Sequence, residues 1–232
     1  MSKLIFISGA SSGIGEYLAY AYAGRGATLG LAARREELLN KVAEKCNELR
    51  GTAHVFQVDA KDQLACKSAA EEFMAQAGGI DMVIANAGIG GHDDLMSGDA
   101  TAINNIIETN VIGVTNTLIP FIPAMKEQKS GILVNVSSVA SFLRIAYHGG
   151  YAGAKVNIRL MADSWRLTLT KYNIQVTTIC PGFIKTPMTD QNNFPMPMIK
   201  SPEFAAEQIF KGLTKKNSFE IHFPKLFTYF MK

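Results

Sequence analysis

Short apolar runs alternate along this chain with longer stretches in which apolar side chains recur every third or fourth position. The runs predict buried strands at 3–8, 27–33, 53–59, 80–86, 131–138, 174–182 and 219–223. The longer stretches predict helices at 13–25, 35–51, 63–77, 100–126, 150–172 and 201–213. This alternation indicates parallel strands joined by right-handed helical crossovers.

The composition is that of one large folded unit. The chain has 232 residues, of which 47% are hydrophobic and 19% are charged, so it can bury a substantial core. We therefore predict a single α/β domain over residues 1–232. Its expected architecture is a doubly wound Rossmann fold, with a mostly parallel seven-stranded sheet and helices on both faces.

Charge and cysteine content narrow the partners and the compartment. The net charge is only +3 and no long basic run occurs, so nothing favours nucleic acid as a partner. The three cysteines are far apart and the histidines are scattered, which predicts no metal site and a reducing compartment. No apolar stretch approaches the roughly 18 residues of a membrane span, and the first apolar run is too short for a signal peptide. We expect a soluble cytoplasmic protein.

A glycine-rich turn, GASSGIG, follows the first predicted strand. Gly9, Gly13 and Gly15 stand where the chain passes from strand to helix. Glycine allows a tight turn and close approach of a phosphate, and the helix N-terminus offers free N–H groups and a positive dipole end. The spacing differs from the GxGxxG fingerprint of dinucleotide sites. The turn favours a bound dinucleotide, and a glycine-rich turn without a ligand is the alternative.

Tyr151 and Lys155 are four residues apart in YAGAK, so on a helix they share one face. Carbonyl reduction needs a hydride on carbon and a proton on oxygen, and a phenol with a pKa of about 10 is a weak acid at neutral pH. A neighbouring ammonium lowers that pKa, and small residues between the two avoid bulk near a cofactor. The alternative is an incidental pair on a surface helix.

Six motifs in order resemble the short-chain dehydrogenase/reductase family, over nearly the whole chain to about residue 222. The family's glycine motif TGxxxGIG is SGASSGIG here, with Ser8 in place of threonine. The other five motifs match Asn86-Ala87-Gly88, Asn110 in ETNVIG, Ser138 in VNVSSVAS, Tyr151 with Lys155, and Pro181-Gly182 with Thr186. The resemblance implies an oxidoreductase that interconverts a carbonyl and an alcohol by hydride transfer.

The resemblance also implies a role for each catalytic side chain. Tyr151 is expected to be the general acid/base, and Lys155 to lower its pKa and hold the nicotinamide ribose. Ser138 is expected to hydrogen-bond the substrate oxygen, and Asn110 to position a water near Lys155. Ser137 competes with Ser138 for this role. The thirteen-residue spacing to Tyr151 favours Ser138, and Ser137 then only caps the strand end.

The expected cofactor contacts come from six places in the chain; the resemblance implies all of them except Arg34 and Arg35, which follow from the position of the second strand. Besides Tyr151 and Lys155, they are Gly9, Ser11, Ser12, Gly13, Ile14 and Gly15 of the glycine turn, Arg34 and Arg35, Asp59, Asn86, Ala87 and Gly88, and Pro181, Gly182, Ile184 and Thr186. The turn is expected to cradle the pyrophosphate, and Ile184 and Thr186 to meet the carboxamide. Asp59 is expected to contact adenine; its alternative role is a turn or helix cap.

The end of the second predicted strand points to NADP(H) as the cofactor. A carboxylate at this position accepts hydrogen bonds from the 2′-hydroxyl of NAD and repels the 2′-phosphate of NADP, whereas arginine does the opposite. The strand ends LAARREE, with Arg34 as the expected phosphate partner and Arg35 assisting. The alternative is that both arginines are solvated and one pairs with Glu36 or Glu37, an exposed contact of little energy.

Two irregular apolar segments leave further alternatives open. Residues 186–201 match the family's substrate lid and contain Met188, Met196 and Met198, which suits an apolar carbonyl or alcohol substrate. The tail 224–232 is Phe-rich, which leaves a membrane-surface or scaffold protein as one rival function. We expect instead that Phe219, Ile221 and Phe223 form a buried strand face and that the tail packs on the core or a partner subunit. Membrane contact is therefore not expected.

A second rival function is a non-catalytic, NADP-binding regulator on the same fold, because a fold alone does not establish activity. The complete set of catalytic motif residues argues against it. The helical regions 100–126 and 150–172 resemble the family's subunit-contact helices, which predicts a homodimer or homotetramer. His148, three residues before Tyr151, is a candidate for the substrate mouth.

Overall fold

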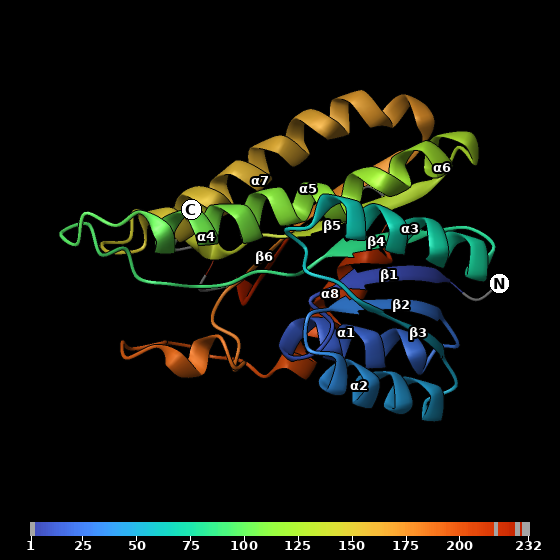
Figure 1. The fold of residues 1–232 in the computed structure, drawn as a ribbon, viewed down its shortest axis with the longest axis horizontal. Helices are drawn as coiled ribbons and strands as arrows, with labels where there is room; N and C mark the ends of the chain where they lie inside the picture. The colour runs from blue at the N-terminus through green and yellow to red at the C-terminus, as the bar shows by residue number, and fades with distance from the viewer. Residues whose placement is uncertain (1–2, 216–217, 226–227, 229–232) are drawn as a thin grey trace.

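A computed structural model of the chain describes residues 3–215, 218–225 and 228. Within these residues, seven strands form one sheet in the order β3-β2-β1-β4-β5-β6-β7, and every pair of neighbours is parallel (Figure 1). The strands are β1 (Leu4–Ser8), β2 (Thr28–Ala33), β3 (Thr52–Gln57), β4 (Met82–Ala85), β5 (Gly131–Val136), β6 (Ile174–Pro181) and β7 (Glu220–Phe223). The predicted doubly wound fold is confirmed.

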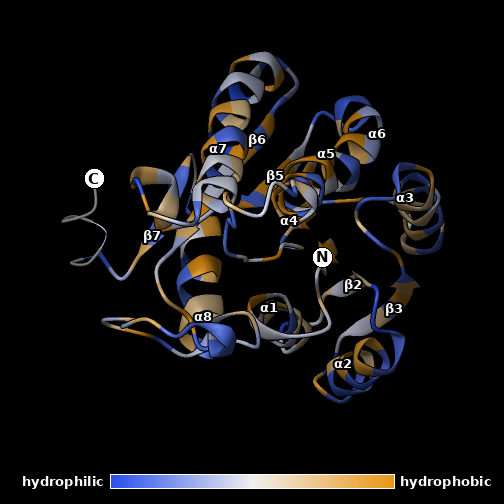
Figure 2. Cartoon of the chain, turned by 60° about the vertical axis from the view of Figure 1, so that its left-hand side comes forward, coloured by the Kyte–Doolittle hydropathy of each residue, from blue (hydrophilic) through white to orange (hydrophobic). Residues whose placement is uncertain are grey.

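Helices cover both faces of the sheet. One face carries α1 (Gly13–Ala23), α2 (Glu36–Glu48) and α8 (Pro202–Leu213). The other carries α3 (Gln63–Ala77), α4 (Thr101–Ile107), α5 (Gly113–Leu118), α6 (Ile122–Glu127) and α7 (Gly149–Leu169) (Figure 1). Figure 2 shows that apolar and polar segments share each helix, as expected for helices with one face on a core.

Each face of the sheet has its own apolar core. On the α1 side, Leu18, Leu39 and Ile209 are fully buried against strand residues. On the α3 side, Phe6 of β1 lies 5.7 Å from Phe73 of α3, measured between ring centroids. Side chains alternate across a strand, so each strand can supply both cores. Burial on both sides explains why the strands are near-continuous apolar runs.

The predicted helical region 100–126 is not one helix. A π-helix over Glu108–Ile112 separates α4 from α5, and a 3-10 turn over Ile119–Phe121 separates α5 from α6. Pro120 and Pro123, which lack an N–H, fall at the second break and at the start of α6. The apolar spacing continues through the breaks, which is why the sequence pattern did not show them.

The C-terminal prediction is partly wrong. Ile221 and Phe223 are buried in β7, but Phe219 precedes the strand and is 49% exposed, with the Arg166 guanidinium 4.7 Å from its ring centroid. Phe227 and Phe230 of the tail 224–232 lie outside the described residues. Of the helices that are described, none is long and apolar enough to span a membrane.

The strand order reverses between β1 and β4. Chain segments leave the carboxyl ends of these two neighbouring strands toward opposite faces of the sheet, α1 to one side and α4 to the other. A crevice opens at such a reversal, and it is where open α/β sheets bind ligands. The fold therefore places the glycine turn and the loop after β4 on the two walls of a ligand site.

Candidate active site

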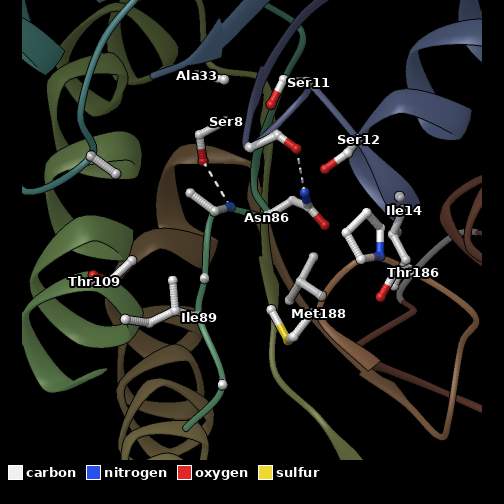
Figure 3. A pocket seen from close by; sticks show the side chains of 18 of the residues that line it. Ser8, Ser11, Ser12, Ile14, Ala33, Asn86, Ile89, Thr109, Thr186 and Met188 are labelled. Atoms are coloured by element: carbon white, nitrogen blue, oxygen red, sulfur yellow. Dashed lines mark hydrogen bonds between the residues drawn. The ribbon is translucent and has the colours of Figure 1, made fainter. Parts of the chain in front are cut away.

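A cleft of about 580 Å³ opens at the reversal between β1 and β4. Its volume lies within the roughly 300–1,000 Å³ of ligand and cofactor sites. All the predicted site residues line it except Gly15, which packs beneath the glycine turn, and Asn110, which is fully buried. Figure 3 shows the turn residues Ser11, Ser12 and Ile14 on one wall and Ile89 and Thr109 on the other.

The glycine turn is held by its own backbone and by Asn86. Gly9 and Gly13 have φ of +66° and +61°, a region that residues with a side chain rarely adopt. The Asn86 side-chain amide donates to the carbonyl of Gly9 at 3.0 Å (Figure 3). A Cβ on Gly15 would lie 2.6 Å from the Asn86 amide nitrogen and would also overlap the Gly9 carbonyl oxygen. The turn therefore has a fixed shape with no room for a methyl group below it.

Two hydroxyl residues connect this turn to the rest of the cleft. The Ser8 hydroxyl accepts a hydrogen bond from the backbone N–H of Ala87 at 3.3 Å, so the serine that replaces the family's threonine keeps a polar contact (Figure 3). Thr186, after β6, lies against the turn, because a Cβ on Gly13 would stand 2.9 Å from its methyl group. The first turn of the predicted lid thus closes one side of the cleft.

Tyr151, Lys155 and Ser138 meet at the other end of the cleft. Tyr151 and Lys155 lie one turn apart on α7, and the Lys155 ammonium is 5.6 Å from the centre of the Tyr151 ring. The Ser138 side chain, just beyond β5, hydrogen-bonds the Tyr151 hydroxyl. Lys155 is 4% exposed and donates to the carbonyl of Val136 at 2.9 Å. A phenol, a hydroxyl and an ammonium therefore line one small part of the cleft.

Burial controls the ionisation of both α7 groups. It raises the pKa of the Tyr151 phenol, and the hydrogen bond with Ser138 partly opposes that rise. It lowers the pKa of the Lys155 ammonium to about 8. The sequence argument expected Lys155 to lower the pKa of Tyr151. In the protein without its cofactor, the loss of hydration dominates and the net pKa of the phenol is raised. The contribution expected from Lys155 stays a prediction.

The two competing serines have different environments. The Ser137 hydroxyl is buried and donates to the carbonyl of Lys155 at 2.8 Å, which ties β5 to α7. The Ser138 hydroxyl accepts from the N–H of Ala140 at 3.1 Å and reaches Tyr151. The Ser137 hydroxyl therefore makes a structural contact with α7 and not the strand-end cap that was expected, and Ser138 lies beside Tyr151.

Asn110 is fixed behind Lys155 by the π-helix. Its amide donates to the carbonyl of Ile89 at 2.8 Å, and its oxygen accepts from the N–H of Ile89 at 3.2 Å. A Cβ on Gly88 would lie 2.5 Å from the Asn110 side-chain oxygen and 3.4 Å from the Lys155 nitrogen. Glycine at position 88 therefore allows Asn110 and Lys155 to approach the same stretch of backbone.

The small residues of YAGAK do not all serve the cleft. Ala152 and Ala154 are buried, but Gly153 is exposed and a Cβ there would meet no atom within 4 Å. The expectation that each small residue avoids bulk near a cofactor is wrong for Gly153, because it points away from the Tyr151–Lys155 face.

Both arginines after β2 line the cleft, but their contacts differ. The Arg35 guanidinium donates to the hydroxyls of Ser11 at 3.1 Å and Ser12 at 2.6 Å, so it crosses the glycine turn. Arg34 stands 3.9 Å from Asp59, and 62% of its side chain is exposed. Among the described residues, neither arginine forms an ion pair with Glu36 or Glu37, as the alternative interpretation required. β2 ends in Ala33, which leaves no carboxylate at that position.

The predicted lid is a loop with a closed base. Its ends are joined where Lys185 N–H donates to Lys200 O at 2.8 Å and Lys200 N–H donates to Phe183 O at 2.9 Å. Met188 lines the cleft, whereas Met196 and Met198 do not (Figure 3). His148 lies near the lid, with its ring centroid 5.8 Å from that of Phe194. Only one of the three lid methionines thus reaches the site directly.

Several lining residues were not predicted. Some adjoin a predicted residue or fall in the predicted lid, so proximity to a motif could have found them: Ala33, Val58, Ala60, Ile89, Thr109, Pro187, Thr189 and Gln191. Others line the cleft from positions away from any predicted residue, and no signal in the sequence points to them: Phe6, Cys66, Ala69, Gly90 and Thr117. Among the described residues, no group of three or more histidine, cysteine or acidic side chains is placed to hold a metal ion.

The fold and cleft define a nucleotide-binding α/β protein of the dehydrogenase class, and comparison with known proteins gives the family. A family model described as short chain dehydrogenase matches residues 3–196. An uncharacterized oxidoreductase of Myxococcus xanthus is 36% identical over 222 residues, covering 96% of this chain and 87% of that protein. The chain belongs to the short-chain dehydrogenase/reductase family, and it is an oxidoreductase by that membership.

Other relatives are longer or more distant. An uncharacterized oxidoreductase of Mycobacterium bovis is 33% identical over 191 residues, which cover 80% of this chain and 56% of that protein. An alcohol dehydrogenase of Thermococcus sibiricus, solved with 5-hydroxy-NADP, has a TM-score of 0.84 and 26% identity, covering 95% of each chain. A short chain dehydrogenase/reductase of Burkholderia phymatum, solved in complex with NAD, has a TM-score of 0.91 and 20% identity. The match covers 99% of this chain and 92% of that chain. Nicotinamide cofactors of both kinds thus occur on this fold.

Proposed function

We propose that this protein is an NADP(H)-dependent oxidoreductase that interconverts a carbonyl and an alcohol, with Tyr151 as the general acid/base. The observation that carries the proposal is the order of groups along one cleft. Arg34 and Arg35 stand at one end, the glycine turn lies between, and Ser138, Tyr151 and Lys155 meet at the other end. A dinucleotide laid along this cleft places its 2′-phosphate and its nicotinamide at opposite ends.

The chain's own groups supply the proton chemistry. The bound nicotinamide delivers or accepts the hydride. The raised pKa of Tyr151 keeps a proton on the phenol at neutral pH, which is the form required to protonate a carbonyl oxygen. Ser138, hydrogen-bonded to that phenol, is placed to donate to the same oxygen as charge develops on it. Lys155, with a pKa of about 8, is largely charged at pH 7 and favours the phenolate that remains.

Substitution of the phenol tests the proposal. Tyr151→Phe keeps the ring and removes the acid, so turnover should fall by at least about a hundredfold while the NADPH dissociation constant stays near the wild-type value. Turnover is followed at the nicotinamide absorbance with ketones, aldehydes and sugars. Ser138→Ala should lower turnover more than Ser137→Ala, which is the matched control. Near-normal turnover in Tyr151→Phe, or the reverse order of the serines, contradicts the assignment.

The rival functions predict different results. A non-catalytic regulator binds NADPH but turns over none of the carbonyl compounds in that panel. A membrane-surface or scaffold protein that acts through its tail floats with liposomes and loses this property when residues 225–232 are removed. The presence of Ser138, Tyr151 and Lys155 in the cleft, with Asn110 buried behind Lys155, supports the enzyme over both.

Substrate, assembly and location are parts of the same proposal. Met188 on the cleft wall supports an apolar carbonyl or alcohol substrate. Exposed apolar side chains on the helices of one face support a homodimer or homotetramer: Ile107, Ile112, Ile119, Leu160 and Leu167. Sedimentation of the purified chain measures the oligomer directly. A cytoplasmic location remains a prediction from the reduced cysteines, Cys46, Cys66 and Cys180.

A further inference from the structure

Asp93, in the loop after β4, lies against the first turn of the helix that carries Tyr151. One of its carboxylate oxygens accepts from the N–H of Gly150 at 3.0 Å, and the residue is 5% exposed. Its backbone N–H donates to the carbonyl of Tyr147 at 2.7 Å. Asp93 therefore contacts the chain on both sides of the start of α7, and Gly150 directly precedes Tyr151.

Two glycines at the start of α7 make room for this carboxylate. A Cβ on Gly149 would lie 3.0 Å from one oxygen of Asp93, and a Cβ on Gly150 would lie 3.1 Å from the other. Neither glycine has a positive φ, so backbone conformation does not require glycine at either position. Space for the Asp93 carboxylate therefore explains Gly149, and together with space for the Ile103 side chain, 3.2 Å from a Cβ at position 150, it explains Gly150.

The start of α7 needs an acceptor from elsewhere in the chain. The first N–H groups of a helix lack partners within it, and they carry the positive end of its dipole. His148, at the N-cap position, makes no side-chain hydrogen bond to α7. Asp93 supplies both the acceptor and a negative charge there. Its second oxygen is buried without a hydrogen-bond partner among the described residues, a cost that limits the net gain in stability.

The loop that carries Asp93 is also fixed at its other end. Asn110 holds Ile89 through both of its side-chain polar atoms. Between these anchors, the carbonyl of Gly91 lies 2.8 Å from the His148 Nδ1, and the His92 ring stacks on Tyr147 with centroids 4.9 Å apart. The loop therefore connects the π-helix behind Lys155 to the first turn of α7, and its residues Ile89 and Gly90 line the cleft.

We propose that Asp93 is a positioning residue for the reaction: it holds the start of α7, and so the Tyr151 hydroxyl, in register with the loop that lines the cleft. The inference rests on the proposed role of Tyr151. A displacement of about 1 Å at a reacting group can cost up to a hundredfold in rate, so a modest shift of α7 is measurable.

Two substitutions at Asp93 separate its acceptor from its charge. Asp93→Ala removes both, and kcat should fall about tenfold while the NADPH dissociation constant and the KM stay within about twofold of wild type. Asp93→Asn retains an acceptor for Gly150, so it should recover most of kcat, to within about threefold of wild type. The matched control is Asp62→Ala, because Asp62 caps α3 by accepting from Ala65 N–H at 2.9 Å and α3 carries no catalytic group. It should lower the melting temperature and leave kcat unchanged.

A double-mutant cycle tests the contact itself. Gly149→Ala should lower kcat about threefold, because its methyl group meets the Asp93 oxygen and no other atom within 4 Å outside the neighbouring backbone. In the Asp93→Ala background the same change should have no effect on kcat. Additive effects of the two substitutions would show that they do not act through this contact.

The outcomes distinguish this inference from the proposed function. A kcat in Asp93→Ala within twofold of wild type, with a melting temperature lowered as in Asp62→Ala, reduces Asp93 to a stabilising cap and overturns the inference. Full activity in Tyr151→Phe overturns the proposed function instead. If Asp93→Ala does not fold, Gly149→Ala decides: a kcat equal to that of wild type overturns the inference, and a loss of about threefold supports it.

Discussion

The two ends of the cleft differ in what forms them: mainly backbone at one end and side chains at the other. In the half with the arginines and the glycine turn, which we call the adenosine end after the proposed cofactor, one continuous segment from β1 through α1 shapes the site mainly through backbone conformation, with Gly9 and Gly13 at positive φ and Gly15 packed beneath them. At the nicotinamide end, single side chains arrive from separate segments: Ser138 after β5, and Tyr151 and Lys155 on α7. A turn shaped by tightly packed glycines has no room for an added methyl group. The geometry of side chains from separate segments depends instead on the contacts that hold those segments together.

The same methyl group added to each region is the strongest test of this difference. In Gly15→Ala the methyl overlaps the Gly9 carbonyl and the Asn86 amide, so the turn must open, at about 1–3 kcal/mol for an overpacked position. NADPH affinity should fall about tenfold to a hundredfold, measured by fluorescence titration. In the control Gly153→Ala the methyl meets open space, so affinity should be unchanged and the free energy of unfolding should rise by up to about 1 kcal/mol. Equal losses of NADPH affinity in Gly15→Ala and Gly153→Ala would contradict this difference between the two regions.

Lys155, at the nicotinamide end, gives a pH test in the protein without cofactor. Its pKa falls from 10.5 to about 8 on burial, so between these values the unfolded chain binds more protons than the folded one. The free energy of unfolding should therefore rise with pH over this window. Burial of the Lys155 ammonium destabilises the folded state most below pH 8, where Lys155 is charged in both states. Relative to Lys155→Met, wild type should gain about 2 kcal/mol from pH 8 to pH 10, measured by urea unfolding. Parallel profiles for the two proteins contradict the lowered pKa.

The smallest expected effect concerns the choice of dinucleotide at the adenosine end. Arg34→Asp removes a charge-assisted contact and adds a negative charge beside Asp59, so NADPH should bind about tenfold more weakly while NADH changes much less. Dissociation constants for both cofactors are compared in wild type and variant. Arg35→Asp is the companion variant, because Arg35 already contacts Ser11 and Ser12 and its loss should also disturb the turn. A wild-type preference for NADH, or equal losses of both cofactors in Arg34→Asp, contradicts the assignment.

The sequence was most informative where function depends on local conformation. Strand and helix positions followed from periodicity, and GASSGIG located the cleft, because the turn is made by consecutive residues. Asp93 gave no signal, since its role depends on Gly150, 57 residues away. The break at the π-helix was hidden because apolar spacing runs through it. The burial that raises the pKa of Tyr151 gave no signal either, because spacing shows a neighbouring charge but does not show burial.

The place of β1 in the sheet has a consequence for synthesis on the ribosome. β1 is made before the other six strands, yet it lies inside the sheet, with β2 on one side and β4 on the other. The segment through β3 can pair within itself as it emerges, but the second edge of β1 stays unpaired until β4, which begins at Met82, has been made. An unpaired apolar edge is a template for association with other chains. The strand that leads into the glycine turn therefore keeps one open edge during synthesis until β4, and with it Asn86, has been made.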